Sequence, residues 1–230
     1  MLESLKRIVY EANMEIFRKG LVIYSFGNVS GLDRRKEIFA IKPSGVSYTK
    51  LRPQDIVLVN LEGEVVEGDY RPSMDTNTHL LLYREFSEIG GIAHTHATYA
   101  SAWAQAERSI PCYGTTHADH FYGEIPVTAK MTDDAIQRNY ETETGKLILA
   151  TFTEKNPSEV PGVLIANHGP CSWGKTPGEA VYHMVLLEEI AKMAMLTESL
   201  NPKVSPIKKL LMDKHYLRKH GKDAYYGQNK

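Results

Sequence analysis

Two histidines with a spacing suited to metal binding occur in the segment Gly91-Ile92-Ala93-His94-Thr95-His96. If this segment is a β-strand, side chains two residues apart point to the same face, so both imidazoles can converge on one ion. A third candidate ligand, His168, follows the apolar run 163–167 and precedes Gly169, at a strand end where α/β proteins often build sites. Three such imidazoles suit Zn²⁺, with Mn²⁺ or Co²⁺ as substitutes.

Other interpretations of these histidines stay open from the sequence. A His-x-His pair is also typical of core or surface histidines with no metal. Asp75 and His79 offer a different metal pair, because residues four apart share a helix face. Asp75 can equally be the N-cap of the following helix, and His79 a buried histidine bonded to backbone. We expect Asp75 to be a metal ligand or a base, and His79 to support the structure.

Three short segments combine serine with glycine or proline and polar or basic residues: 27–31, 42–45 and 71–73. Turns of this composition can present backbone N–H groups and hydroxyls to a phosphate, and Lys42 would add a positive charge. Each segment is also compatible with an ordinary turn. None of them matches the P-loop or the dinucleotide fingerprint, so the sequence disfavours ATP and NAD as ligands.

The composition of the 230 residues is that of an ordinary globular protein. Lys and Arg together number 27 against 28 Asp and Glu, which predicts no nucleic-acid partner. The two cysteines, Cys112 and Cys171, form no C-x-x-C pattern, as expected of a reducing compartment. No segment approaches the roughly 20 apolar residues of a membrane span. We therefore expect a soluble, cytoplasmic protein with no membrane partner.

The pattern of apolar residues predicts alternating helices and strands. Helices are expected over 2–20, 76–86, 97–107, 132–152 with an interruption near Gly145, 176–200 and 203–220. Strands are expected over 38–42, 56–60, 91–95 and 163–167. This mixture, without an internal repeat or long linker, predicts one layered α/β domain over residues 1–230 with helices on both faces of a sheet.

Several motifs occur in the order found in the class II aldolase family, which the sequence resembles along its whole length. These motifs are Gly27-Asn28-Val29-Ser30, Ile41-Lys42-Pro43-Ser44-Gly45-Val46, Pro72-Ser73-Met74-Asp75-Thr76 and His94-Thr95-His96. Segments 114–123 and 213–228 narrow the resemblance to family members that convert L-ribulose 5-phosphate to D-xylulose 5-phosphate.

The resemblance implies a three-layer α/β/α fold with a central, mainly antiparallel sheet, assembled as a homotetramer with active sites at subunit interfaces. It implies zinc ligation by His94, His96 and His168, with Asp75 on or beside the metal. It implies acid/base roles for Asp119 and for Tyr226, which would reach across from the neighbouring subunit with His215 nearby. It also implies binding of a phosphorylated ketopentose, chiefly its phosphate, by Gly27, Asn28, Lys42, Ser44, Gly45, Ser73, Met74, Thr115 and His215.

One position departs from the family pattern. Members commonly carry a second serine where this chain has Met74, so a hydroxyl donor to the phosphate is lost while the backbone N–H remains. The effect of Met74 on phosphate affinity and substrate preference therefore stays open from the sequence.

The implied reaction explains why such a site needs these groups. The C2 carbonyl of L-ribulose 5-phosphate acidifies the proton on C3 but not the one on C4, so inversion at C4 requires cleavage and re-formation of the C3–C4 bond. That route needs a cation for the negative charge, an anchored phosphate and acid/base groups on two faces. Two alternatives remain at this point: an aldolase acting on another sugar phosphate, such as L-fuculose 1-phosphate, and a non-catalytic metal-binding protein of the same fold.

Overall fold

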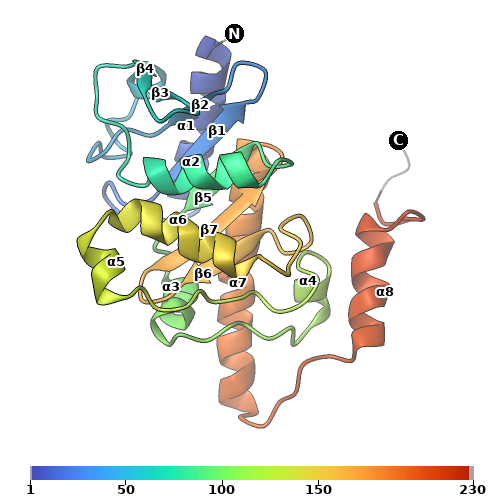
Figure 1. Cartoon of the computed structure of the whole chain (residues 1–230). Helices are drawn as coiled ribbons and strands as arrows, with labels where there is room; N and C mark the ends of the chain where they lie inside the picture. The colour runs from blue at the N-terminus through green and yellow to red at the C-terminus, as the bar shows by residue number, and fades with distance from the viewer. Residues whose placement is uncertain (1, 228–230) are drawn as a thin grey trace.

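A single seven-stranded sheet organises the protein (Figure 1), whose computed structural model describes residues 2–227 and so leaves Gln228 of the C-terminal motif outside the described residues. The strand order is β4-β3-β2-β1-β5-β7-β6, and each neighbouring pair is antiparallel. The strands are β1 (Asn28–Asp33), β2 (Ile38–Ile41), β3 (Val57–Asn60), β4 (Val65–Glu67), β5 (Gly91–His94), β6 (Gly162–Ile165) and β7 (Gly169–Gly174).

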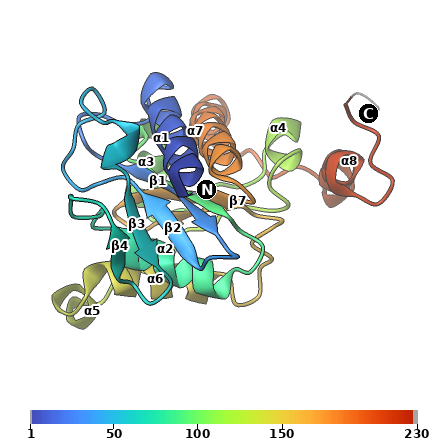
Figure 2. The same ribbon diagram turned by 90° about the horizontal axis from the view of Figure 1, so that it is seen from above.

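Helices cover both faces of this sheet, as Figure 2 shows from above. Helices α1 (Leu2–Arg18) and α7 (Pro177–Leu200) pack on one face, and α2 (Thr76–Glu85) and α6 (Tyr140–Thr151) pack against each other on the opposite face. The other helices are η1 (Pro53–Asp55), α3 (Thr98–Gln105), α4 (Thr115–Ala118), α5 (Asp133–Gln137) and α8 (Lys209–His220). The predicted three-layer α/β/α fold with an antiparallel sheet is therefore confirmed.

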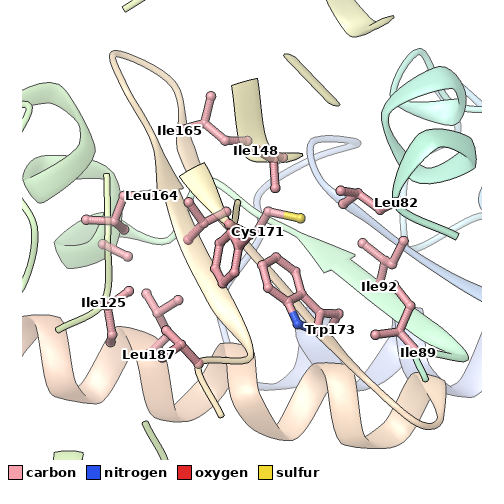
Figure 3. Packing of buried hydrophobic residues seen from close by; sticks show 14 of the residues in the cluster. Leu82, Ile89, Ile92, Ile125, Ile148, Leu164, Ile165, Cys171, Trp173 and Leu187 are labelled. Carbon is pink, nitrogen blue, oxygen red and sulfur yellow. The ribbon is translucent and has the colours of Figure 1, made fainter. Parts of the chain in front are cut away.

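The main hydrophobic core fills the space between the sheet and its helices (Figure 3). Trp173 of β7 lies opposite Ile92 of β5, and its ring packs against Phe86 and Phe152 at centroid distances of 5.3 and 5.0 Å. Its indole N–H donates to the carbonyl of Pro157 at 2.8 Å, so the one polar atom of the ring is satisfied. This core holds fixed the strand ends from which the site is built.

Strands β1, β4 and β7 and helices η1 and α4 were not predicted, for two reasons: β1 and β7 consist largely of small residues, and the other three elements are very short. Strands β1 and β7 are rich in serine and glycine rather than in β-branched residues, so segment 27–31 looked like a turn. In β1 the small residues serve close packing, because a Cβ at Gly31 would lie 2.5 Å from the ring of Pro177 and 2.9 Å from Val9. Strand β4 and the one-turn helix α4 are too short for a periodic signal.

The helical prediction over 132–152 was wrong about the position of the interruption. The chain breaks at Arg138 and Asn139, where the Asn139 side chain accepts from the backbone N–H of Thr142 and caps α6. Gly145 instead lies inside α6, where a Cβ would approach Leu81 of α2 to 2.9 Å. The prediction of a continuous helix over 203–220 was also too long, since α8 begins at Lys209.

Substitution of Gly91 by alanine is expected to destabilise the fold. An added Cβ would meet the backbone of Thr176 and Pro177 at 2.4 Å, and backbone at the start of α7 cannot move aside without displacing the helix. We expect a loss of about 1–3 kcal/mol in the free energy of unfolding, measured by urea denaturation. Gly178→Ala is the matched control, because its Cβ meets nothing nearer than 4.0 Å; equal stability of the two variants would contradict the argument.

Candidate active site

The three predicted ligand histidines come together at one end of the sheet and are called the histidine triad below. Nitrogen atoms of His94, His96 and His168 all lie within 4.8 Å of one another, and the ring centroids are 4.6 to 5.1 Å apart. The convergence was predicted, but its premise of a single strand was wrong. Strand β5 ends at His94, opposite Cys171 of β7, and His96 lies in the loop that follows.

The donor set of the triad fits a transition metal that prefers imidazole. The Nδ1 of His94 lies 2.9 Å from the carbonyl of Pro170, which fixes Nδ1 as the protonated nitrogen and leaves the Nε2 lone pair free. Burial, followed by the charge of His94, lowers the pKa of His168 to about 3, and the pKa of His96 is lowered by the same causes. Neutral imidazoles are the form that binds Zn²⁺.

Asp75 lies at the N-cap position of α2 but does not cap it. Its carboxylate instead accepts from the Asn28 amide at 2.6 Å. Burial alone would raise the pKa of Asp75, yet the imidazoles of His94, His79 and His168 and the Asn28 hydrogen bond bring it below its usual value. Asp75 is therefore a carboxylate facing the triad, and the interpretation of a plain N-cap was wrong.

His79 lies beneath Asp75, fully buried between α2 and the sheet. Its Nδ1 is 2.7 Å from the Ser30 hydroxyl, which in turn contacts the hydroxyl of Tyr83 at 2.7 Å. Burial lowers the pKa of His79 to about 4, so the ring is neutral. The expected bond to backbone is replaced by this chain of side-chain contacts. Within residues 2–227, the side chains placed to bind one metal ion together are those of the triad, and His79 is not among them.

A cavity of about 310 Å³ opens in front of the triad. Two of the three predicted phosphate turns form its far wall, and they are hydrogen-bonded to each other: the Ser44 N–H donates to Arg71 and the Ser73 N–H to Lys42, each at 3.0 Å. The predicted substrate residues that line this cavity with Asp75 and the triad are Gly27, Asn28, Lys42, Ser44, Gly45, Ser73 and Met74. The Met74 side chain is 67% exposed at the rim.

The ammonium group of Lys42 is the buried positive charge of this cavity. It donates to the carbonyl of Ser25 at 3.0 Å and lies 4.9 Å from the centre of the Tyr48 ring. Burial lowers the pKa of Lys42 to about 8, and among residues 2–227 no carboxylate forms an ion pair with it. An anion in the cavity would supply the missing counter-charge. Asn28 also has a buried amide oxygen without a partner in the described part of the chain.

Three other predicted site residues, Asp119, His215 and Tyr226, form a second cluster between α4 and α8. The Asp119 carboxylate accepts from His215 at 3.0 Å and from the Arg218 guanidinium at 2.9 and 3.0 Å. Arg218 also lies 5.0 Å from the ring centre of Tyr226. Although burial would raise the pKa of Asp119, the hydrogen bonds of Arg218 and His215 and the charge of Lys219 keep it below its usual value. Asp119, His215 and Tyr226 therefore lie together beside the cations Arg218 and Lys219.

The two groups of predicted residues do not meet within one chain. Asp119, His215 and Tyr226 do not line the cavity of the triad. Thr115 lines a separate cavity of about 270 Å³ between α4 and α7. Figures 1 and 2 show α8 beside α4 at one side of the molecule, apart from the sheet. Tyr225 and Tyr226, which follow α8, are exposed and therefore accessible to another molecule.

Comparison with known proteins identifies the family of this chain. The sequence profile described as "Class II Aldolase and Adducin N-terminal domain" matches residues 7–195. The chain belongs to the class II aldolase family. Proteins named L-ribulose-5-phosphate 4-epimerase UlaF from Salmonella paratyphi C (strain RKS4594) and Salmonella choleraesuis (strain SC-B67) are each 49% identical to it over 227 residues, covering 99% of this chain and 100% of theirs.

Solved structures share the class II aldolase fold. An L-fuculose 1-phosphate aldolase superposes with a TM-score of 0.79 at 24% identity, covering 92% of this chain and 94% of that one. An L-fuculose 1-phosphate aldolase from Glaciozyma antarctica PI12 gives a TM-score of 0.78 at 20% identity, covering 96% and 84%. These likenesses concern the fold. Within the described residues, no helix of this chain is long and apolar enough to cross a membrane.

Two residues at the site were missed from the sequence. Arg218 lies within the motif 213–228 but has no role predicted from the sequence, and its guanidinium donates to the Asp119 carboxylate. Tyr140 was placed inside an expected helix, and its hydroxyl lies 3.2 Å from Nδ1 of His168. Neither has a local sequence signal, because each reaches its partner across a distance of 28 or more residues in the chain.

Proposed function

We propose that this chain is an L-ribulose-5-phosphate 4-epimerase, which inverts C4 of a phosphorylated ketopentose. The observation that carries the proposal is the cavity in which the histidine triad faces Lys42 and the paired serine turns. Such a cavity can hold a sugar carbonyl at one end and a phosphate at the other. The 49% identity to full-length proteins that bear this name supports the same activity.

The triad would hold the metal ion, with Asp75 beside it or on it. Zinc is the ion that three neutral imidazoles favour, and Mn²⁺ or Co²⁺ would be substitutes. When bound, the cation would act as a Lewis acid that offsets the negative charge developing on the substrate when the C3–C4 bond breaks. Asp75 accepts from Asn28, so its carboxylate is held in place beside the triad before any ligand arrives.

Anchoring of the phosphate would fall to Lys42, Ser44, Gly45 and Ser73, with Asn28 between them and the triad. Retro-aldol cleavage produces a two-carbon aldehyde phosphate. For C4 to be inverted, this fragment must stay bound while its aldehyde group rotates to present the opposite face. A fixed anion site achieves this, because the phosphate stays bound while the aldehyde group rotates. Met74 lies at the rim of this anion site, where its backbone N–H remains available and the hydroxyl of the family's serine is absent.

Acid/base chemistry would come from Asp119, Tyr226 and His215. Because these three lie together and do not line the cavity of their own chain, we propose that a neighbouring copy in a homotetramer brings them to it, with Thr115 at the same junction. The C4 hydroxyl loses its proton during cleavage and regains one from the opposite side, so two groups are needed.

We also propose that residues 1–230 form one catalytic domain, in keeping with the continuous sheet.

The proposal is tested by incubating the metal-loaded protein with L-ribulose 5-phosphate and following the products by NMR. We expect D-xylulose 5-phosphate to form without accumulation of fragments, and chelation to abolish its formation. Re-addition of Zn²⁺ to the chelated protein should restore it, which excludes damage by the chelator. Net release of an aldehyde or ketone fragment would instead indicate an aldolase, and no reaction by a metal-loaded tetramer would overturn the epimerase assignment.

A further inference from the structure

The imidazoles of the triad are held in different ways. His94 is fixed by the backbone, through the carbonyl of Pro170. His168 is bonded through Nδ1 to a side chain, the phenol of Tyr140, at 3.2 Å. We propose that Tyr140 is a positioning residue that orients the His168 ring and sets its tautomer for metal binding. This proposal rests on the metal site of the proposed function.

The backbone around His168 is fixed, but its ring is not. Asn167 has a φ of +59°, a left-handed conformation that turns the chain sharply between β6 and β7. A Cβ at Gly169 would lie 2.7 Å from the carbonyl of Thr95, so the turn is also pressed against the loop that carries His96. These contacts fix the Cα of His168. They leave the rotation of its half-buried ring to the one hydrogen bond described for it.

The phenol of Tyr140 is delivered from a rigid element in a different layer. Tyr140 is the first residue of α6, directly after the capping residue Asn139. The first turn of α6 is tied to α2 because Thr78 donates to the backbone carbonyl of Glu141 at 2.7 Å. The close approach of α6 and α2 at Gly145 holds the two helices together. Tyr140 thus links the helical layer that carries Asp75 to the third imidazole.

The hydrogen bond has a definite direction in the metal-binding state. The phenol oxygen of Tyr140 can accept a hydrogen bond from an imidazole N–H, and it lies 3.2 Å from Nδ1 of His168. When Nδ1–H of His168 donates to this oxygen, Nε2 carries the lone pair. A hydrogen-bond partner on the ring nitrogen that does not bind the metal commonly contributes about 10- to 100-fold to metal affinity. Without it, the ring can rotate and adopt the other tautomer.

The experiment compares Zn²⁺ affinity of the purified protein and of Tyr140→Phe by competition with a chelator, without substrate. We expect the Kd of the variant for Zn²⁺ to be about tenfold higher. The midpoint of urea unfolding of the metal-free protein should be unchanged. Tyr113→Phe is the matched control, because its hydroxyl is bonded to Glu198 at 2.7 Å away from the triad. The control should keep the affinity of the unchanged protein.

A second readout separates positioning from general loosening of the structure. In the metal-free protein, ¹⁵N NMR of His168 should show mainly the Nδ1–H tautomer, and in Tyr140→Phe a shift toward Nε2–H. Equal Zn²⁺ affinity of the two proteins would overturn the proposal, and so would weaker affinity with no change in tautomer. Neither readout needs turnover, so a chain that fails as an epimerase but loses zinc in Tyr140→Phe would refute the proposed function alone.

Discussion

Replacement of His94 by asparagine is expected to strip the protein of its metal and to reduce epimerisation to background. An amide is a far weaker ligand for Zn²⁺ than a neutral imidazole, and two histidines do not make a closed site. We expect metal affinity to fall by about 100-fold or more, beyond the effect of losing an outer partner. The fold should survive, since asparagine can still donate a hydrogen bond in the direction of the Pro170 carbonyl. Metal content after dialysis and turnover of L-ribulose 5-phosphate give the measurements.

His183→Asn provides the matched control for this experiment. Like His94, His183 donates from Nδ1 to a backbone carbonyl, that of Trp173 at 2.7 Å, and it is partly buried. It does not line the cavity, so its replacement should change stability without changing metal content. A His94→Asn protein that kept a full complement of zinc would contradict the ligand assignment. Equal loss of zinc in both variants would attribute the effect to the fold rather than to ligation.

The order of elements was largely predictable because it depends on local pattern. Helices α1, α2, α3 and α7 follow the predicted periodicity, as do strands β2, β3, β5 and β6. Strands β1 and β7 could not be predicted on that basis, because they are interior strands and the start of α7 approaches Gly31 and Gly174 too closely for larger side chains at those positions. At Gly174 an added Cβ would already meet Glu179 at 2.7 Å. Sheet position thus overrode strand propensity at these sites.

The candidate site was predictable in composition and less so in arrangement. The triad and the Lys42 and Ser73 turns were named from the sequence, and the structure brings them around one cavity. The convergence of His168 with His94 depends on the pairing of β7 with β5, a contact between segments far apart in the chain. The same holds for Asp119, whose partners Arg218 and His215 arrive on α8 about a hundred residues later. No local pattern reports such contacts.

Replacement of Asp119 by asparagine is expected to lower kcat by about 100-fold or more, the usual contribution of a positioned acid/base group. The variant should keep its metal, because Asp119 does not line the cavity of the triad. It should also keep α8 in place, since the amide oxygen can still accept from Arg218. The kcat of purified variant and unchanged protein, each loaded to the same zinc content, gives the measurement, and gel filtration checks assembly.

Asp213→Asn is the control that separates chemistry from docking of α8. Asp213 also ties α8 to the segment after α4, because its carboxylate accepts from the Tyr122 hydroxyl at 2.5 Å, but it has no part in the proposed reaction. Loss of turnover in Asp119→Asn but not in Asp213→Asn would mean that the carboxylate itself moves the proton. If both variants lost activity equally, the ion pairs would matter because they hold α8 and Tyr226 against the neighbouring subunit, and Asp119 would leave the mechanism. Because Arg218 keeps Asp119 ionised, we propose that the carboxylate enters the reaction as a base, which would make His215 or Tyr226 the source of the returning proton.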